Sequence, residues 1–239
     1  MEKPHQWDEI QVPIGRVARF IRQVTHDVRN GLSAIDLEAA FIAEIATDPE
    51  VAEEIRKLRE MVGASANMLR ELSQNFQPVA LHEIPWQARV FFRELQSRVE
   101  AAFPEEKNIV FEGILSSDTG SIFVDLEQMI AAVLHGVRNA VQFRRDEEEP
   151  IRIIATMLGD GSFFIDILES RPEIDSQFPV ELWGTKPLFS TRSGGYGLGL
   201  WKMQEIVVAH GGEVERRHRD GMLRTRITLP EYHDEERPV

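Results

Sequence analysis

The sequence contains no cysteine, which rules out both a disulfide framework and a thiolate zinc site. No stretch approaches the roughly 20 uninterrupted apolar residues that a membrane-spanning helix needs. Residues 1–10 also lack the basic-then-apolar pattern of a signal peptide. Together these absences predict a cytoplasmic protein without membrane insertion.

Basic residues are scarce relative to acidic ones. The chain has 27 lysines and arginines against 40 aspartates and glutamates, a net charge of −13. A surface of this sign repels nucleic-acid phosphates, so we expect no nucleic-acid partner. At 239 residues and 42% hydrophobic content, the chain is long enough for one large domain or two small ones with a real core.

Apolar or small residues in the first third recur in steps of four and three, the heptad pattern of helices that pack against other helices. The first stripe is Val17, Ile21, Val24, Val28, Gly31, Ile35 and Ile42, and the second is Val51, Ile55, Leu58, Val62, Ser65, Leu69, Leu72 and Phe76. Either Asp48 as a cap before Pro49 or a capping box of Thr47 and Glu50 starts the second helix near residue 49. Pro78 ends it.

Two antiparallel helices cannot bury stripes of this length against each other alone. We favour a second copy of the chain, which gives a homodimer with a four-helix bundle. The alternative is an intramolecular bundle with a helix that we expect at residues 85–103.

His26 lies two residues from both Val24 and Val28, so at about 100° per residue it points away from the apolar stripe. By itself this pattern is typical of an ordinary surface histidine. However, Asp27 follows directly, and Asn30 lies one turn on, on the same helix face. A carboxylate bonded to one ring nitrogen fixes the tautomer and makes the other nitrogen a better nucleophile.

The run from His26 to Ile35 resembles the phosphoacceptor box of two-component sensor histidine kinases, in which His, an acid, a basic residue, Asn, Pro, Leu and Ile occur in this order. Gly31 replaces the proline. The resemblance implies that His26 carries the phosphoryl group and that Asp27 is its base or orienter. It also implies that Asn30 positions water for the reverse, phosphatase reaction.

The remaining two thirds of the chain predict an α+β fold, an α/β sandwich whose mixed sheet has helices on one face. Gly159-Asp160-Gly161 predicts a hairpin turn, and Gly211-Gly212 the end of the last helix. We expect strands at 108–113, 120–124, 151–157, 162–168 and 223–229, and further helices at 126–144 and 200–210.

Two stretches here resemble the nucleotide-binding boxes of histidine kinases and gyrase-type (GHKL) ATPases. Residues 134–140 resemble the box that places an Asn carbonyl on the Mg²⁺ bridging the ATP phosphates. Asn139 holds that position, and His135 replaces an Asn one turn earlier. Residues 187–200, followed by Ala-His-Gly-Gly at 209–212, resemble the phenylalanine box and glycine-rich lid. The expected ATP contacts in the lid are Gly195, Gly197, Leu198 and Gly199.

The lid has a clear physical basis, because glycines let backbone N–H groups approach phosphate closely and a following helix adds its positive end. A third box departs from the family. Glu169 stands where the family has the Asp that accepts the adenine amino group, and Arg171 and Glu173 replace two glycines. This degenerate adenine box predicts a weakened ATP affinity or a vestigial pocket.

The resemblance divides the chain into an N-terminal extension (1–13), a dimerisation and phosphotransfer hairpin (14–79), an ATP-binding domain (80–232) and a charged tail (233–239). It implies an ATP-dependent protein-histidine kinase that uses Mg²⁺ and passes the phosphoryl group to the receiver domain of a response regulator. Since residues 1–13 are too few for a sensor module, we expect any sensor to be a separate protein.

Two alternatives stay open at this point. One is an ATP-independent histidine phosphotransfer protein with a vestigial ATPase domain. The other is a dimeric scaffold that uses neither phosphate nor ATP. The first helix begins with three basic residues, Arg16, Arg19 and Arg22. They either steer the acidic receiver towards His26 or form an ordinary solvent-exposed face.

Overall fold

The structure is a computed structural model that describes residues 13–115, 120–144, 148–158, 162–174, 179–187 and 197–230. Contacts within the chain divide it between Pro78 and Val79 into two compact units. This boundary lies one residue before the predicted one between residues 79 and 80.

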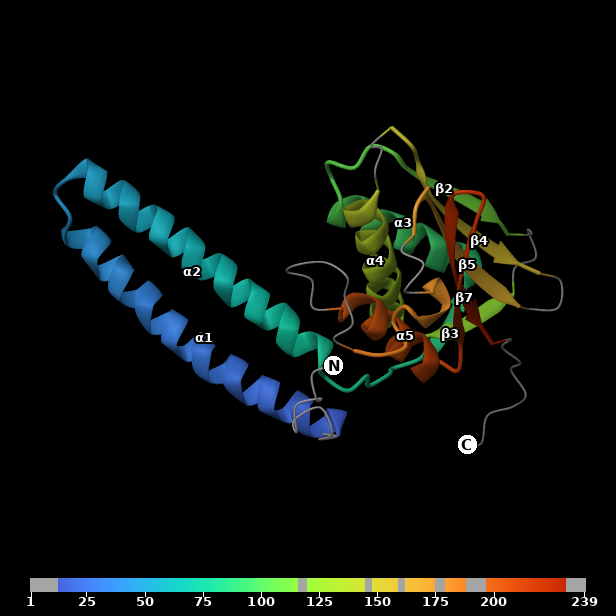
Figure 1. Cartoon of the computed structure of the whole chain (residues 1–239), viewed down its shortest axis with the longest axis horizontal. Coiled ribbons are helices and arrows are strands. Elements are labelled where there is room, and N and C mark those ends of the chain that lie inside the picture. Colours follow the sequence, from blue (N-terminus) through green and yellow to red (C-terminus); the bar gives the residue numbers. More distant parts are fainter. Residues whose placement is uncertain are drawn as a thin grey trace, which may run out of the picture. The chain divides into compact units, whose positions relative to one another are not determined.

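The first unit is a helical hairpin of α1 (Ile14–Ile45) and α2 (Pro49–Asn75), drawn in blue to teal in Figure 1. The carboxylate of Asp48 accepts a hydrogen bond from the backbone N–H of Glu50 at 2.9 Å, and Pro49 is the first helical residue. Of the two possible starts for the second helix, the structure therefore has the Asp48 cap.

On α2 the hairpin packs through the predicted stripe, whereas on α1 it packs through residues beside the predicted stripe. The buried residues at the contact are Thr25 and Ala39 on α1 and Ile55 and Val62 on α2. Four residues of the predicted α1 stripe stay half-exposed: Val24 at 40%, Val28 at 44%, Ile35 at 49% and Ile42 at 40%. Two helices thus leave an apolar stripe uncovered, as expected from its length.

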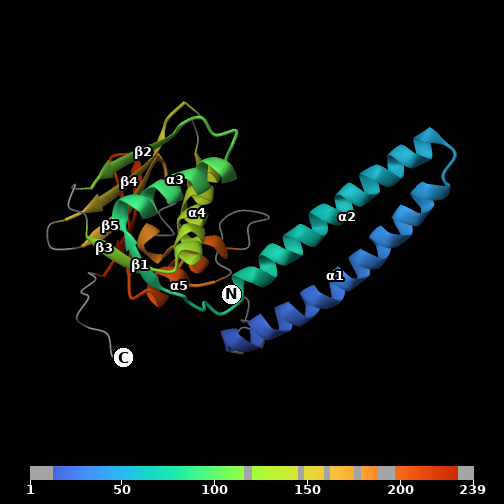
Figure 2. The same ribbon diagram turned by 180° about the vertical axis from the view of Figure 1, so that it is seen from behind.

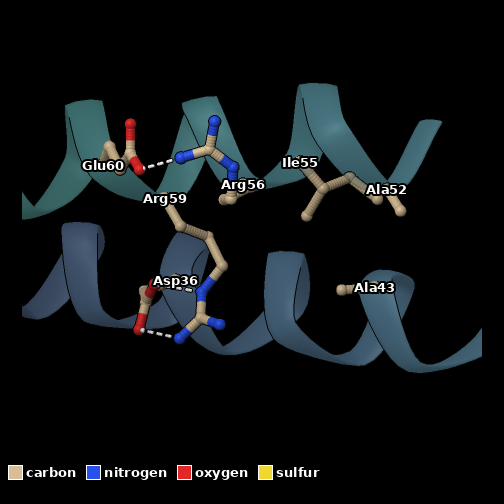
Figure 3. Close-up of a pocket in the computed structure, with 7 residues that line it drawn as sticks. All are labelled: Asp36, Ala43, Ala52, Ile55, Arg56, Arg59 and Glu60. Carbon is tan, nitrogen blue, oxygen red and sulfur yellow. Dashed lines mark hydrogen bonds and ion pairs between the residues drawn. The ribbon is translucent and has the colours of Figure 1, made fainter. Parts of the chain in front are cut away.

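A cleft lies between the two helices of the hairpin (Figure 3). At one end, Nε of Arg59 on α2 donates to the Asp36 carboxylate on α1 at 2.8 Å, while Arg56 pairs with Glu60 along α2. The other end is lined by small or apolar side chains: Ala43, Ala52 and Ile55.

The second unit is an α+β fold whose five-stranded sheet has the order β2-β4-β5-β7-β6. Strand β2 is parallel to β4 and the other pairs are antiparallel, so the sheet is mixed, as predicted. Strands β1 and β3 form a separate antiparallel pair. The bounds are β1 Ile84–Gln87, β2 Ile109–Ile114, β3 Ser121–Val124, β4 Ile151–Met157, β5 Phe163–Ser170, β6 Glu213–Arg219 and β7 Met222–Leu229.

Three helices lie on one face of the large sheet (Figures 1 and 2): α3 (Ala88–Ala102), α4 (Leu126–Phe143) and α5 (Gly199–Ala209). Alternate residues of β4 are fully buried beneath them, as expected for a strand with one covered face. The rings of Phe91 on α3 and Phe163 on β5 meet edge to face, with centroids 6.0 Å apart. The core therefore lies between this helical layer and the sheet.

Asp125 begins α4, and its carboxylate accepts the backbone N–H of Gln128 at 3.0 Å. Its own N–H donates to the buried ring of His210, at the end of α5, at 3.1 Å. Gly211 follows with φ of +72°, which confirms the predicted glycine end of that helix. The start of α4 and the end of α5 are thus tied together.

Two predictions for this unit are wrong in part. The helix expected at 85–103 begins only at Ala88, because Ile84–Gln87 pairs with β3 as a strand. Strand β6 was not predicted: its sequence, Glu-Val-Glu-Arg-Arg-His-Arg, offers no apolar face. The predicted turn at 159–161 lies outside the described residues.

Gly212 offers a test of the packing. A β-carbon there would lie 2.5 Å from the Thr228 carbonyl oxygen and 3.0 Å from Val207 Cγ1. Because a backbone oxygen cannot move aside cheaply, we expect Gly212→Ala to lower the free energy of unfolding by about 1–3 kcal/mol in urea denaturation. Gly63→Ala is the control: its methyl group meets nothing within 4 Å in the middle of α2, so it should stabilise by about 0.5–1 kcal/mol. Equal effects of the two changes would contradict the packing.

Candidate functional site

The first candidate site lies on the outer face of α1 around His26, whose side chain is 59% exposed. Its Nδ1 lies 3.2 Å from the Asp27 carboxylate and 3.4 Å from Nδ2 of Asn30. Both predicted partners thus meet the same ring nitrogen. Nε2 of the ring faces neither of them.

Gln23 completes this cluster and was missed by the sequence analysis. Its amide donates to both oxygens of Asp27, at 3.2 Å each, from four residues earlier on the helix. The i,i+4 spacing was a signal that could have found it. The hydrogen bond with His26, and then that with Gln23, lower the pKa of Asp27 below its usual range. In the tautomer that carries its proton on Nδ1, the ring donates to the ionised Asp27 carboxylate, and this leaves Nε2 with its lone pair.

The second candidate site follows one face of α4. His135, Asn139 and Phe143 lie at i, i+4 and i+8, so they form a row along the helix about 12 Å long. Gly136, Val137 and Ala140, on the neighbouring face of the helix, are buried in the core. A β-carbon added to Gly199, the first residue of α5, would lie 3.5 Å from Nδ1 of His135. The start of α5 therefore lies at the His135 end of the row.

The start of α5 has the features that phosphate binding requires. Gly197 has φ of +61°, a conformation that favours glycine. Leu198 is buried at 3% exposure and anchors the turn in the core. The start of α5 at Gly199 carries the partial positive charge of a helix N-terminus. Gly195, the fourth predicted lid contact, lies outside the described residues.

His135 is neutral in the folded protein. Burial, and then the positive charges of Arg138 and Lys202, lower the pKa of His135 to about 4. A neutral imidazole can accept a hydrogen bond or bind a metal ion. His135 can therefore make some of the contacts expected of the asparagine that it replaces.

The Phe143 end of the row differs from the family pattern. Strand β5 extends to Ser170, so Glu169 lies within the strand. The prediction that Glu169 follows the strand is therefore wrong. Its carboxylate pairs with the Arg171 guanidinium at 2.9 Å, and the two side chains are only 4% and 9% exposed. Burial raises the pKa of Glu169, although the Arg171 charge opposes that shift.

Arg171 also packs against two aromatic rings. Its guanidinium carbon lies 4.9 Å from the centroid of Phe143 and 5.3 Å from that of Trp183, both within cation–π range. Arg216, buried on β6, donates to the Trp183 carbonyl oxygen at 2.5 Å and fixes this segment. Burial lowers the pKa of Arg216 to about 10. Trp183 and Arg216 were not predicted, because only the folded chain brings Trp183 to Arg171 and Arg216 to Trp183.

The residues fit ATP·Mg²⁺ at one end of the row better than at the other. Asn139, His135 and the start of α5 suit a triphosphate with its metal ion. At the other end, Glu169 already has a cationic partner, so it is not free to accept an amino group. His26 belongs to the hairpin unit, and Asn139 and Glu169 belong to the other.

Within the described residues, no group of three or more histidine, aspartate or glutamate side chains could hold a metal ion by itself. A metal ion at Asn139 would therefore depend on phosphate oxygens for most of its ligands. In the same part of the chain, no helix has the length and apolar character needed to span a membrane.

Curated proteins with similar sequences are sensor histidine kinases. The kinase AtoS of Escherichia coli (strain K12) is 26% identical over 210 residues, covering 84% of this chain and 32% of AtoS. The kinase/phosphatase NtrB of Vibrio alginolyticus is 25% identical over 228 residues, covering 88% of this chain and 61% of NtrB. The chain thus spans less than two thirds of these relatives. No protein-family profile matches it.

Solved structures of histidine kinases share the fold. Full-length ShkA in complex with AMPPNP matches 89% of this chain and 46% of its own length, with a TM-score of 0.69 and 17% identity. The kinase ThkA in complex with the response regulator TrrA matches 88% of this chain and 60% of its own, with a TM-score of 0.56 and 18% identity.

The low pKa of His135 makes stability depend on pH. In the unfolded chain a histidine gains a proton near pH 6.5, whereas folded His135 stays neutral down to about pH 4. The unfolded state binds more protons in this window, so the fold loses stability as the pH falls through it. Between pH 7 and 5, we expect wild type to lose about 2 kcal/mol more than His135→Asn in urea denaturation. Equal losses in both proteins would show that His135 does not titrate in this way.

Proposed function

We propose that this chain, which shares sequence features and fold with the catalytic core of sensor histidine kinases, phosphorylates itself on His26 from ATP. It then passes the phosphoryl group to an aspartate of a response regulator. The observation that carries the proposal is the exposed His26 ring, with Asp27 and Asn30 both at Nδ1.

The atom that receives the phosphoryl group follows from this geometry. Since Asp27 accepts the Nδ1 proton, the lone pair of the ring lies on Nε2. Nε2 forms a bond to the γ-phosphorus while the bond from that phosphorus to the β–γ bridging oxygen breaks, and ADP leaves. The Nδ1 proton stays with the ring, and the Asp27 carboxylate offsets the positive charge that the ring gains.

The row on α4 is the proposed ATP site. Asn139 would hold a Mg²⁺ ion through its side-chain oxygen, and the ion would neutralise charge on the phosphates when bound. The backbone N–H groups at Gly197 to Gly199 would bind phosphate oxygens. The likeness to a kinase solved with AMPPNP supports this placement.

The homodimer is also a proposal. The exposed stripe of Val24, Val28 and Ile35 on α1 has no cover within the described hairpin, and on α2 Leu58 is 41% exposed. A second hairpin would cover this stripe in a four-helix bundle. Its side chains would also fill the cleft beside Ala43 and Ala52 (Figure 3).

The response regulator is proposed from the comparison with ThkA, which was solved with its regulator. An acidic receiver pocket would meet the basic residues Arg16, Arg19 and Arg22 at the start of α1. Asn30, one turn from His26, would position a water molecule for the phosphatase reaction. Any sensor is proposed to be a separate protein or part of a longer chain.

The second candidate is an ATP-independent histidine phosphotransfer protein. The specific observation in its favour is the ion pair of Glu169 with Arg171, which engages the residue expected to accept adenine. Because the phosphate end of the row is well formed, we favour the kinase.

The two candidates differ in the source of phosphate. Purified protein with γ-³²P-ATP and Mg²⁺ should gain acid-labile, base-stable label, and both His26→Ala and Asn139→Ala should abolish it. Suppose instead that wild type takes no label from ATP but accepts phosphate on His26 from a phosphorylated receiver. The kinase proposal would then be wrong, and the phosphotransfer protein would replace it.

Asp27 provides a second test. Asp27→Asn removes the carboxylate that holds the Nδ1 proton, so the initial rate of self-phosphorylation should fall about 10²-fold or more. Asp36→Asn is a matched control on the same helix, since Asp36 is also exposed and bonded to a side chain, that of Arg59. It should leave the rate within about twofold of wild type. A similar loss in both variants would contradict a direct role for Asp27.

A further inference from the structure

We infer that Arg171 occupies the slot that a purine base would enter, so that nucleotide binding requires its side chain to swing out. This inference rests on the proposed ATP site along α4 and concerns the regulation of that site. Arg171 would then set the nucleotide affinity of the protein.

The slot lies at the end of the α4 row. Phe143 is four residues beyond Asn139 on the same helix face, so a nucleotide with its phosphates near Asn139 and Gly199 would bring its base towards Phe143. A flat base needs an aromatic or apolar face to stack on and an acceptor for its amino group. Phe143 and Trp183 supply the faces, and Glu169 supplies the acceptor.

The Arg171 guanidinium takes all three of these contacts. It lies against the rings of Phe143 and Trp183 and donates to Glu169 through Nη2 at 2.9 Å. A guanidinium is planar and cationic, so it suits the same aromatic faces that a base would use. While it stays there, a base can neither stack on them nor reach the carboxylate.

The buried Arg171 side chain does not have all its hydrogen bonds, and this favours its replacement by a base. Nε of Arg171 is buried and has no hydrogen-bond partner within the described residues. A buried donor without a partner is unfavourable, and burial of the charged pair costs solvation of both groups. A swing into water would rehydrate the guanidinium and leave Glu169 for the amino group of a base.

Only the side chain has to move. The backbone N–H of Arg171 donates to the Gly221 carbonyl oxygen at 2.7 Å, and its carbonyl oxygen accepts from Nε2 of His218, also at 2.7 Å. These bonds tie the backbone to β6 and to the turn between β6 and β7. The side chain can therefore rotate while the backbone stays in place.

The test measures binding of two probes with Mg²⁺ by calorimetry. AMP-PNP carries a base, whereas inorganic tripolyphosphate fills only the phosphate end. Arg171→Gln keeps much of the side-chain length but loses the charge, and Arg171→Gly restores the residue that the family resemblance expects. Arg217→Gln on the exposed part of β6 is the control. Thermal unfolding of each variant checks that it is folded, so that Arg171→Gln serves if Arg171→Gly does not fold.

We expect AMP-PNP to bind the Arg171 variants at least about tenfold more tightly than wild type, with tripolyphosphate affinity unchanged. The control should match wild type for both probes. Equal gains for both probes would overturn the inference, since they would indicate a general loosening of the site. Unchanged AMP-PNP affinity would also overturn it and leave the ATP proposal intact. If no folded protein binds either probe, the proposed ATP site itself is wrong, and the inference fails with it.

Discussion

The close approach of α4 to its neighbours is the constraint on which the proposed nucleotide site depends. A β-carbon at Gly136 would lie 2.6 Å from Cδ1 of Ile167 on β5 and 3.4 Å from the sulfur of Met203 on α5. His135, Asn139 and Phe143 lie along the border of that buried face and stay partly exposed. The bond from Asp125 to His210 fixes the ends of the same two helices. The close packing at Gly136 and the Asp125–His210 hydrogen bond together set the position of α4 relative to α5.

The two units contribute different parts of the proposed chemistry. The hairpin presents His26 on an exposed helix face, away from the apolar stripe that we assign to the dimer. The second unit offers the proposed phosphate site at the start of α5 and the proposed base site, where Arg171 lies. A kinase of this kind would be limited by access of the base to its slot, with the reactive histidine already prepared by Asp27.

Features coded by near neighbours in the sequence were predictable. The Asp48 cap, the heptad stripes, the His26 cluster and the glycine end of α5 each depend on residues within a few positions of one another. Tertiary contacts were not predictable in this way. The Arg171 stack joins α4, β5 and the segment at Trp183, and β6 is a strand only because β7 pairs with it. On α1 the contact lies beside the predicted stripe, at Thr25 and Ala39, whereas on α2 it uses the predicted residues Ile55 and Val62.

The most direct test of the central claim, that nucleotide lies along the α4 row, is a titration with Mg²⁺ and AMP-PNP followed by amide NMR. The account predicts that shifts at millimolar nucleotide concentrate at Asn139, Phe143 and the start of α5 from Gly197 to Gly199. Shifts that spare α4 and α5, or no shifts at all, would contradict it.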